Sequence, residues 1–284
     1  MLFSSITFLY YFLPIVLTLY LIVPSKYKNK VLLTFSLLFY FYGEPKYIII
    51  LLLSCFINYL AGRLIDKYRK KSKLILIFCV LYNVIQLLYF KYTDFLILNI
   101  NNIFNTKIGL FRVVMPIGIS FFTFQTLSYV IDVYRENVKA SKDFLNFTTY
   151  VSLYPQLKAG PIVRYKDIEK ELQERKNSFD DFGNGVKRFI IGLSKKVLIA
   201  NILGELCASI TSMNEVTVLC SWINSIAFTL QIYFDFSGYS DMAIGLGLMF
   251  GFHFSENFNY PFIAKSITEF WRRGHIALSS LYRV

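Results

Sequence analysis

The chain has 284 residues, of which 55% are hydrophobic, 18% aromatic and only 17% charged. This composition, with a mean hydropathy of +0.49, excludes an ordinary soluble domain and indicates an integral membrane protein. The net charge of +12 does not indicate a nucleic-acid partner, because the basic residues cluster in short loops between apolar runs, where lipid head groups explain them.

The first apolar run, residues 5–23, contains no charged residue and is long enough to cross a bilayer core of roughly 30 Å. No Lys or Arg precedes it and no small-residue cleavage site follows it, so we expect a retained transmembrane helix rather than a removed signal peptide.

Further apolar runs follow along the chain at 31–43, 47–61, 74–90, 108–131, 216–236 and 242–254, with shorter stretches at 95–104, 147–157 and 189–203. The sequence therefore predicts an all-α polytopic membrane protein with about seven or more transmembrane helices, plus re-entrant and interfacial helices. We expect residues 1–284 to form a single membrane-embedded domain.

Charge in the loops predicts the orientation of the first helices. The loops 24–30 and 62–73 are rich in Lys and Arg, whereas the turn 43–46 is balanced. The positive-inside rule then places the N-terminus outside, and the mixed charges beyond the fourth helix predict no orientation. Residues 162–172 carry apolar side chains at helical spacing, which is typical of a helix lying on the membrane surface.

Four cysteines, Cys55, Cys79, Cys207 and Cys220, lie in or beside apolar segments, and the chain has only two histidines. Without a C-x-x-C pair, this pattern predicts buried free thiols and no metal site.

Polar side chains inside apolar runs are costly, so they are candidates for function. In "PIGISFFTFQ", Pro116 and Gly118 interrupt the run; we expect Ser120 and Thr123 to bond their own backbone, whereas Gln125 is a candidate.

In "YPQLKAGPIVRY", two prolines and a glycine prevent a continuous helix and hold Gln156, Lys158 and Arg164 on a bent loop. Such a loop can line a cavity in which cations meet a phosphate or a polarised carbonyl, or it can be a surface connection facing lipid; the sequence leaves both open.

In "LQIYFDFSGYSDMAIG", Gln231 and Asp235 share a helix face. We expect a break at Gly238, a second helix capped by Ser240, and tight packing at Gly247 and Gly251. We expect Asp235 and Asp241 to have architectural roles, bonded to freed backbone N–H groups or to an arginine, rather than to form an acid–base pair.

The final segment, 267–284, has the pattern of one helix with Trp271, Arg272 and His275 on one side. His275 is therefore a candidate for catalysis, and its neighbour Arg273 is a candidate contact.

Together, the motifs P-I-G-I-S-F-F-T-F-Q, D-V-Y-R, Y-P-Q-L-K-A-G-P-I-V-R-Y, Q-I-Y-F-D-F-S-G-Y-S-D-M-A-I-G, F-x-E-N-F-N-Y-P and I-T-E-F-W-R-R-x-H-I-x-L-S resemble the membrane-bound O-acyltransferases, in particular their alginate O-acetyltransferase-like bacterial branch. The resemblance runs from the first residues to Ser279. It implies a ring of tilted helices around a tunnel in the cell membrane, where an acyl group passes from a cytosolic thioester to a hydroxyl of an exported or cell-surface polysaccharide.

The resemblance also implies partners and roles. The donor would be acetyl-coenzyme A or an acyl carrier protein, no cofactor would stay bound, and an extracytoplasmic acyltransferase would be the partner in the bilayer. His275 matches the histidine of the W-R-R-x-H segment and is expected to have a supporting role. The candidates for lining the tunnel or contacting substrate are Gln125, Gln156, Lys158, Arg164, Gln231, Asp235, Asp241, Trp271, Arg272 and Arg273.

Two departures from the family pattern bear on activity. The W-H-G segment that carries the family's principal histidine is not found in this chain, and Gly274 stands where an aromatic is usual. We expect a chain that is incomplete at its C-terminus and that is inactive alone if the family's full architecture is needed for activity. We expect His253 to be an interfacial or satisfied residue. The alternatives are a transporter or flippase for a lipid-linked glycan and a non-catalytic partner of an acyltransferase complex.

Overall fold

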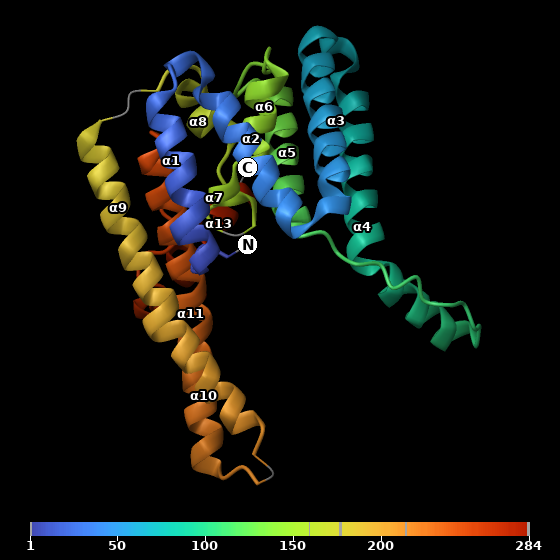
Figure 1. Ribbon diagram of the computed structural model, residues 1–284. Coiled ribbons are helices and arrows are strands. Elements are labelled where there is room, and N and C mark those ends of the chain that lie inside the picture. The colour runs from blue at the N-terminus through green and yellow to red at the C-terminus, as the bar shows by residue number, and fades with distance from the viewer. Residues whose placement is uncertain (1, 159, 176–177, 214, 283–284) are drawn as a thin grey trace. The chain divides into compact units, whose positions relative to one another are not determined.

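The computed structural model describes residues 2–158, 160–175, 178–213 and 215–282. Every secondary-structure element in this part of the chain is a helix (Figure 1). Contacts divide the chain into two compact units. The first comprises Met1–Lys28, Ala159–Val163 and Asp167–Val284, and the second comprises Asn29–Lys158 and Arg164–Lys166.

The first unit is built mainly on helices from the two ends of the chain. Its elements are the π-helical η1 (Thr7–Phe12), α1 (Leu13–Ile22), η2 (Ser25–Tyr27), α9 (Phe179–Ser194), the π-helical η5 (Lys195–Ala200), α10 (Asn201–Thr211), α11 (Val218–Met249), η6 (Pro261–Ile263), α12 (Ile267–Arg273) and α13 (Ile276–Tyr282). The second unit contains α2 (Lys28–Gly43), η3 (Pro45–Tyr47), α3 (Ile48–Lys67), η4 (Arg69–Lys71), α4 (Ser72–Phe104), α5 (Ile119–Tyr134), α6 (Phe144–Ser152) and α7 (Tyr154–Leu157), and α8 (Tyr165–Gln173) follows it in the chain.

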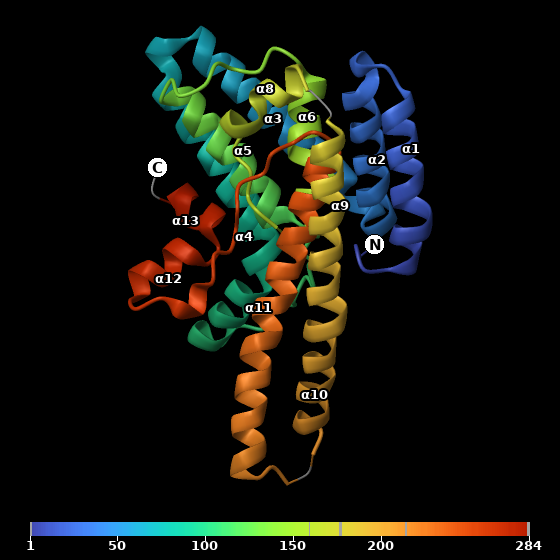
Figure 2. The ribbon, with the colours of Figure 1, turned by 90° about the vertical axis from the view of Figure 1, so that its left-hand side faces the viewer.

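Glycines allow α9 and α11 to approach closely and run side by side (Figure 2). A Cβ added at Gly192 would lie 2.6 Å from the carbonyl oxygen of Gly238, and one at Gly238 would lie 2.8 Å from that of Gly192. Two turns along each helix, Gly185 and Gly245 repeat this reciprocal contact at 2.7 and 2.6 Å. Backbone therefore meets backbone at two levels, which places the polar residues of α9 within reach of those on α11.

Helix α11 is continuous, so the predicted break at Gly238 and second helix at Ser240 are wrong. Gly238 serves close packing against α9 rather than helix termination. The predicted packing role of Gly247 and Gly251 against a neighbouring helix is also wrong: a Cβ at Gly247 would meet the ring of Phe254, and Gly251 has φ of 75°, where the chain turns after the helix.

In the second unit, α3, α4 and α5 pack against one another. Buried amides join two of them, because Nδ2 of Asn83 on α4 donates to Oδ1 of Asn58 on α3 at 2.9 Å. A Cβ at Gly62 of α3 would overlap the ring of Tyr129 on α5. The hydroxyl of Tyr129 in turn accepts the N–H of Ser141 at 3.0 Å, which ties the chain after α5 back onto that helix.

Several predicted element boundaries are wrong. The stretch 95–104 continues α4 instead of forming its own segment, and 108–118 precedes α5 instead of belonging to it, because Gly118 adopts a left-handed conformation with φ of 77° at the helix start. The apolar side chains of the predicted surface helix, Ile162, Tyr165, Ile168 and Leu172, are all buried in the protein.

Two helical segments in the described part of the chain, Pro45–Lys67 and Arg69–Phe104, are long and apolar enough to cross a membrane, and Thr7–Ile22 is a shorter apolar one. The all-α class is thus confirmed, while the larger number of spans stays a prediction.

Candidate functional site

His275 lies in a sharp turn between two short helices, so the prediction of one continuous helix over 267–284 is wrong for the residues described. Helix α12 ends at Arg273, Gly274 is extended, and α13 begins at Ile276. His275 itself has φ of 50°, a left-handed conformation that costs a residue with a side chain about 1 kcal/mol or more. The surrounding contacts must therefore hold this turn in place.

Asn257 supplies most of those contacts. It is fully buried, its carbonyl oxygen accepts the N–H of Ile276 at 3.0 Å, and its Oδ1 lies 3.4 Å from the N of Ala277 and 3.3 Å from Nδ1 of His275. Its Nδ2 donates to Oγ of Ser240 on α11 at 2.9 Å. One amide thus joins the histidine turn to the long helix.

The His275 ring packs edge-on against Phe236, with ring centroids 4.9 Å apart and an interplanar angle of 83°. Phe236 and Ser240 lie one turn apart on α11, so the same face of this helix supplies the apolar wall and the polar anchor. Burial lowers the pKa of His275 below its ordinary value, which favours the neutral imidazole.

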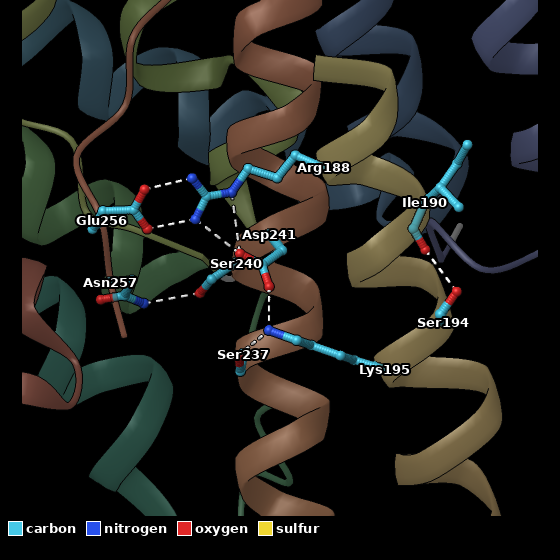
Figure 3. A network of polar contacts seen from close by, with 9 residues as sticks. All are labelled: Arg188, Ile190, Ser194, Lys195, Ser237, Ser240, Asp241, Glu256 and Asn257. Atoms are coloured by element: carbon cyan, nitrogen blue, oxygen red, sulfur yellow. Dashed lines mark hydrogen bonds and ion pairs between the residues drawn. The ribbon is translucent and has the colours of Figure 1, made fainter. Parts of the chain in front are cut away.

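A network of charges lies next to this anchor (Figure 3). Both Nη atoms of Arg188 on α9 bind the carboxylate of Glu256, and Nη2 also lies 2.9 Å from Oδ1 of Asp241. Lys195 Nζ lies 2.6 Å from the second oxygen of Asp241 and 3.2 Å from Oγ of Ser237. Two cations and two carboxylates therefore balance where α9, α11 and the loop after α11 meet.

The other candidates on α11 lie nearer its middle. Asp235 pairs with Lys196 at 2.6 Å, with its side chain 44% exposed, and the amide of Gln231 faces the backbone at Gly204 of α10. Both carboxylates predicted to be architectural, Asp235 and Asp241, thus bind basic side chains of the α9–η5 segment.

Helix α12 carries three further candidates, Trp271, Arg272 and Arg273. Ser266 caps its start, Glu269 accepts the N–H of Lys265, and Arg273 Nε donates to Glu269 at 2.8 Å. These bonds lower the pKa of Glu269, the Lys265 N–H contributing most. Arg273 is therefore engaged locally, whereas Trp271 and Arg272 are exposed.

Four candidates belong to the second unit. Arg164 binds Asp132 of α5 through two atoms, with Nη2–Oδ1 at 2.5 Å and Nε–Oδ2 at 3.2 Å, and both side chains are buried. Nδ2 of Asn137 also donates to Asp132 at 3.0 Å. Arg164 is thus half of a buried ion pair.

Gln125 on α5 and Gln156 on α7 are completely buried. Gln156 Nε2 donates to the carbonyl of Tyr150 at 2.6 Å, but its Oε1 and both amide atoms of Gln125 have no hydrogen-bond partner among the described residues. Lys158 is partly exposed at the end of α7.

Sequence reasoning singled out His275 but missed the residues that hold it. Asn257 and Glu256 lie within the motif F-S-E-N-F-N-Y-P, yet the pattern does not reveal that Asn257 is buried and Glu256 exposed. Arg188 could have been sought as the cation that a partly buried Asp241 requires. His253, left outside the site, lies with Nδ1 2.8 Å from Glu171 and is exposed.

Residues 39–280 match the membrane-bound O-acyltransferase family. Over its whole length the chain is 42% identical to a probable alginate O-acetylase, AlgI, of Pseudomonas aeruginosa, and spans 56% of that relative. It is 33% identical to a peptidoglycan O-acetyltransferase of Helicobacter pylori, with 98% of the chain and 60% of the relative covered. A teichoic acid D-alanyltransferase of Bacillus subtilis is 26% identical over 59% of the chain and 43% of its own length.

The chain is thus a member of a class of membrane enzymes that transfer acyl groups. It belongs to the membrane-bound O-acyltransferase family. This membership favours an acyltransferase over the transporter alternative.

Proposed function

We propose that this protein takes part in O-acyl transfer, most simply O-acetyl transfer, from a thioester to hydroxyls of a cell-surface or exported polysaccharide. The observation that carries the proposal is the half-buried His275, whose pKa is lowered by burial and which Asn257 holds in a left-handed turn within a chain of this family. The relatives named for alginate and peptidoglycan O-acetylation support the acceptor class.

In the proposed reaction the acceptor hydroxyl oxygen attacks the thioester carbonyl, an ester C–O bond forms, the C–S bond breaks, and the hydroxyl proton ends on the departing thiol. His275 has a supporting role: its Nε2 accepts a hydrogen bond from the acceptor hydroxyl and orients the oxygen for attack. The exposed guanidinium of Arg272 is available for the anionic groups of a donor such as acetyl-coenzyme A or an acyl carrier protein.

The remaining expectations belong to the same proposal. The protein would reside in a bacterial cell membrane with several spans and its N-terminus outside, and an extracytoplasmic acyltransferase would receive or direct the acyl group. The two apolar helices and the family's membrane character support the first of these expectations.

Membranes from cells that express the chain test the proposal with labelled acetyl-coenzyme A and purified alginate or peptidoglycan. We expect base-labile label on the polysaccharide above that of membranes without the chain. His275→Gln should lower it by about tenfold or more, and His253→Gln, which alters the other histidine, should not. Absence of polysaccharide label above background would overturn the proposal for this chain, and full activity of His275→Gln would overturn the role of His275.

A further inference from the structure

We infer that Asn257 is a positioning residue that fixes which nitrogen of His275 carries the proton. Its catalytic consequence rests on the proposed function, but the hydrogen-bond assignment does not. The side-chain amide of Asn257, in the first unit, has hydrogen-bond donors on one side and an acceptor on the other.

The orientation of the Asn257 amide follows from the backbone. The N–H of Ala277 can only donate, so the amide atom that faces it at 3.4 Å must be the oxygen, Oδ1. The same oxygen faces Nδ1 of His275 at 3.3 Å. Because an amide oxygen only accepts, Nδ1 must carry a hydrogen, and in the neutral ring Nε2 then carries the lone pair.

The opposite side of the amide is anchored to α11. Nδ2 donates to Oγ of Ser240 at 2.9 Å, which keeps Oδ1 directed toward the histidine. If the amide rotated by 180°, Nδ2 would face the Ala277 N–H and two donors would oppose each other. The anchor and the turn therefore select one amide orientation and, through it, one imidazole tautomer.

Charges hold the segment that carries Asn257. The adjacent residues Glu256 and Asn257 face the adjacent residues Asp241 and Ser240, as Figure 3 shows. Arg188 bridges the two carboxylates, and the amide–hydroxyl bond joins the other two side chains. The loop is thus fixed to α11 at two consecutive positions, which limits both its sliding and its rotation.

Among the residues that the structure describes, no charged side chain is in contact with the imidazole. From α11 the ring meets Phe236, and from the loop it meets Asn257. The nearby charges have partners of their own, Glu256 with Arg188 and Arg273 with Glu269. The neutral amide therefore determines the tautomer without adding charge to the site.

The test uses the whole chain in detergent micelles with ¹⁵N-labelled histidine. The chain has only two histidines, so His253→Gln assigns the remaining imidazole signals to His275. We expect the nitrogen signals of a neutral ring with Nδ1 protonated and Nε2 unprotonated. Asn257→Leu, which removes the acceptor at similar volume, should shift the ring to the opposite tautomer.

Two further variants keep the inference testable if Asn257→Leu does not fold. Asn257→Asp keeps an oxygen beside Nδ1 and can accept from the Ser240 hydroxyl, so it should retain the tautomer while the new carboxylate shifts the titration of His275 upward. Ser240→Ala frees the amide and should allow the opposite tautomer to appear. The matched control is Asn259→Asp, because Asn259 is exposed and pairs through its backbone N–H with Arg273.

An unchanged tautomer in both Asn257→Leu and Ser240→Ala, or an Nε2-protonated ring in the unaltered chain, would overturn the inference. In the acyl-transfer assay, Asn257→Leu should lower kcat by about tenfold to 100-fold with little change in KM. If the tautomer changes as expected while no acyl transfer occurs in any variant, the positioning role stands and the proposed function fails.

Discussion

Asp132 and Arg164 are opposite charges that the second unit buries together. The Asp132 side chain is completely buried and that of Arg164 is 9% exposed. Asp132→Asn keeps the shape but leaves the guanidinium without its counter-charge, so we expect the free energy of unfolding to fall by about 3–5 kcal/mol. Replacing both partners, as Asp132→Asn with Arg164→Met, should recover part of this loss. Denaturant unfolding in detergent measures the effect.

An exposed ion pair in the same unit provides the control. Arg69 lies 2.9 Å from Asp66 with side chains 38% and 43% exposed, so Asp66→Asn should cost less than about 1 kcal/mol. Equal losses from Asp132→Asn and Asp66→Asn would contradict the view that burial makes the first pair important.

His275 links stability to pH in a direction that its pKa determines. Burial lowers the pKa of the folded-state imidazole, so the unfolded chain binds its proton first as the pH falls below the ordinary value of about 6.5. The stabilisation is present above this value and declines as the pH decreases toward the folded-state pKa. We expect the thermal midpoint of the unaltered chain to fall more than that of His275→Gln over this range. A parallel decline in both proteins would show that other groups account for it.

At the scale of elements, the close packing of α9 against α11 predicts that replacing glycine by alanine has opposite effects at two positions. Gly238→Ala would place a methyl group 2.8 Å from the Gly192 carbonyl oxygen and force the helices apart, at a cost of about 1–3 kcal/mol. Gly183→Ala lies in α9, where no described atom beyond the neighbouring helix backbone lies within 4 Å of the added Cβ, and it should stabilise the helix by up to about 1 kcal/mol. Melting of purified protein distinguishes them, and equal shifts would refute the packing argument.

The helices were easier to predict than their ends and contacts. Apolar runs located α1 to α5 and α11, because a buried or lipid-facing helix must be apolar over its length. Gly238 was misread as a helix break because the sequence does not reveal that Gly192, 46 residues earlier, faces it. The turn at Gly274 and His275 was missed for a similar reason: a bridge between Phe258 and Gly274 and the Asn257 contacts replace helical bonds there.

In the candidate site, too, individual residues could be predicted from the sequence but their partners could not. His275, Asp241 and Arg164 could be selected because ionisable groups among apolar residues need partners. The partners Asn257, Arg188 and Asp132 could not be assigned, because each lies 18 or more residues away in sequence and only the fold determines the pairing.

At the scale of the whole molecule, each unit pairs its own polar groups. The first pairs Arg188 and Lys195 with two carboxylates around α11, and the second buries the Asp132–Arg164 pair and the Asn58–Asn83 amides. In this chain, which is 55% hydrophobic, these charged side chains are thus paired with partners in their own unit. The charged residues of the short loops can then determine the orientation of the helices in the membrane.

These loop charges lead to a prediction for α2, α3 and α4. Basic residues dominate the connection from α3 to α4, so we expect this connection to face the cytosol. In the connection from α2 to α3 an acidic residue balances the basic one, so we expect this connection to face the outside. Single cysteines at Lys70 and Gly43 report the two sides, since both positions are exposed and no described atom beyond the local backbone lies within 4 Å of a Cβ at Gly43.

The labelling is done in a Cys220→Ser background, because Cys55, Cys79 and Cys207 are buried whereas Cys220 is partly exposed. A membrane-impermeant maleimide should label Gly43→Cys in intact cells and Lys70→Cys only after the membrane is opened. The reverse pattern would place the N-terminus in the cytosol, since one helix separates each of these connections from the next. Equal labelling of both before permeabilisation would show instead that α3 does not cross the membrane, despite its length and apolar composition.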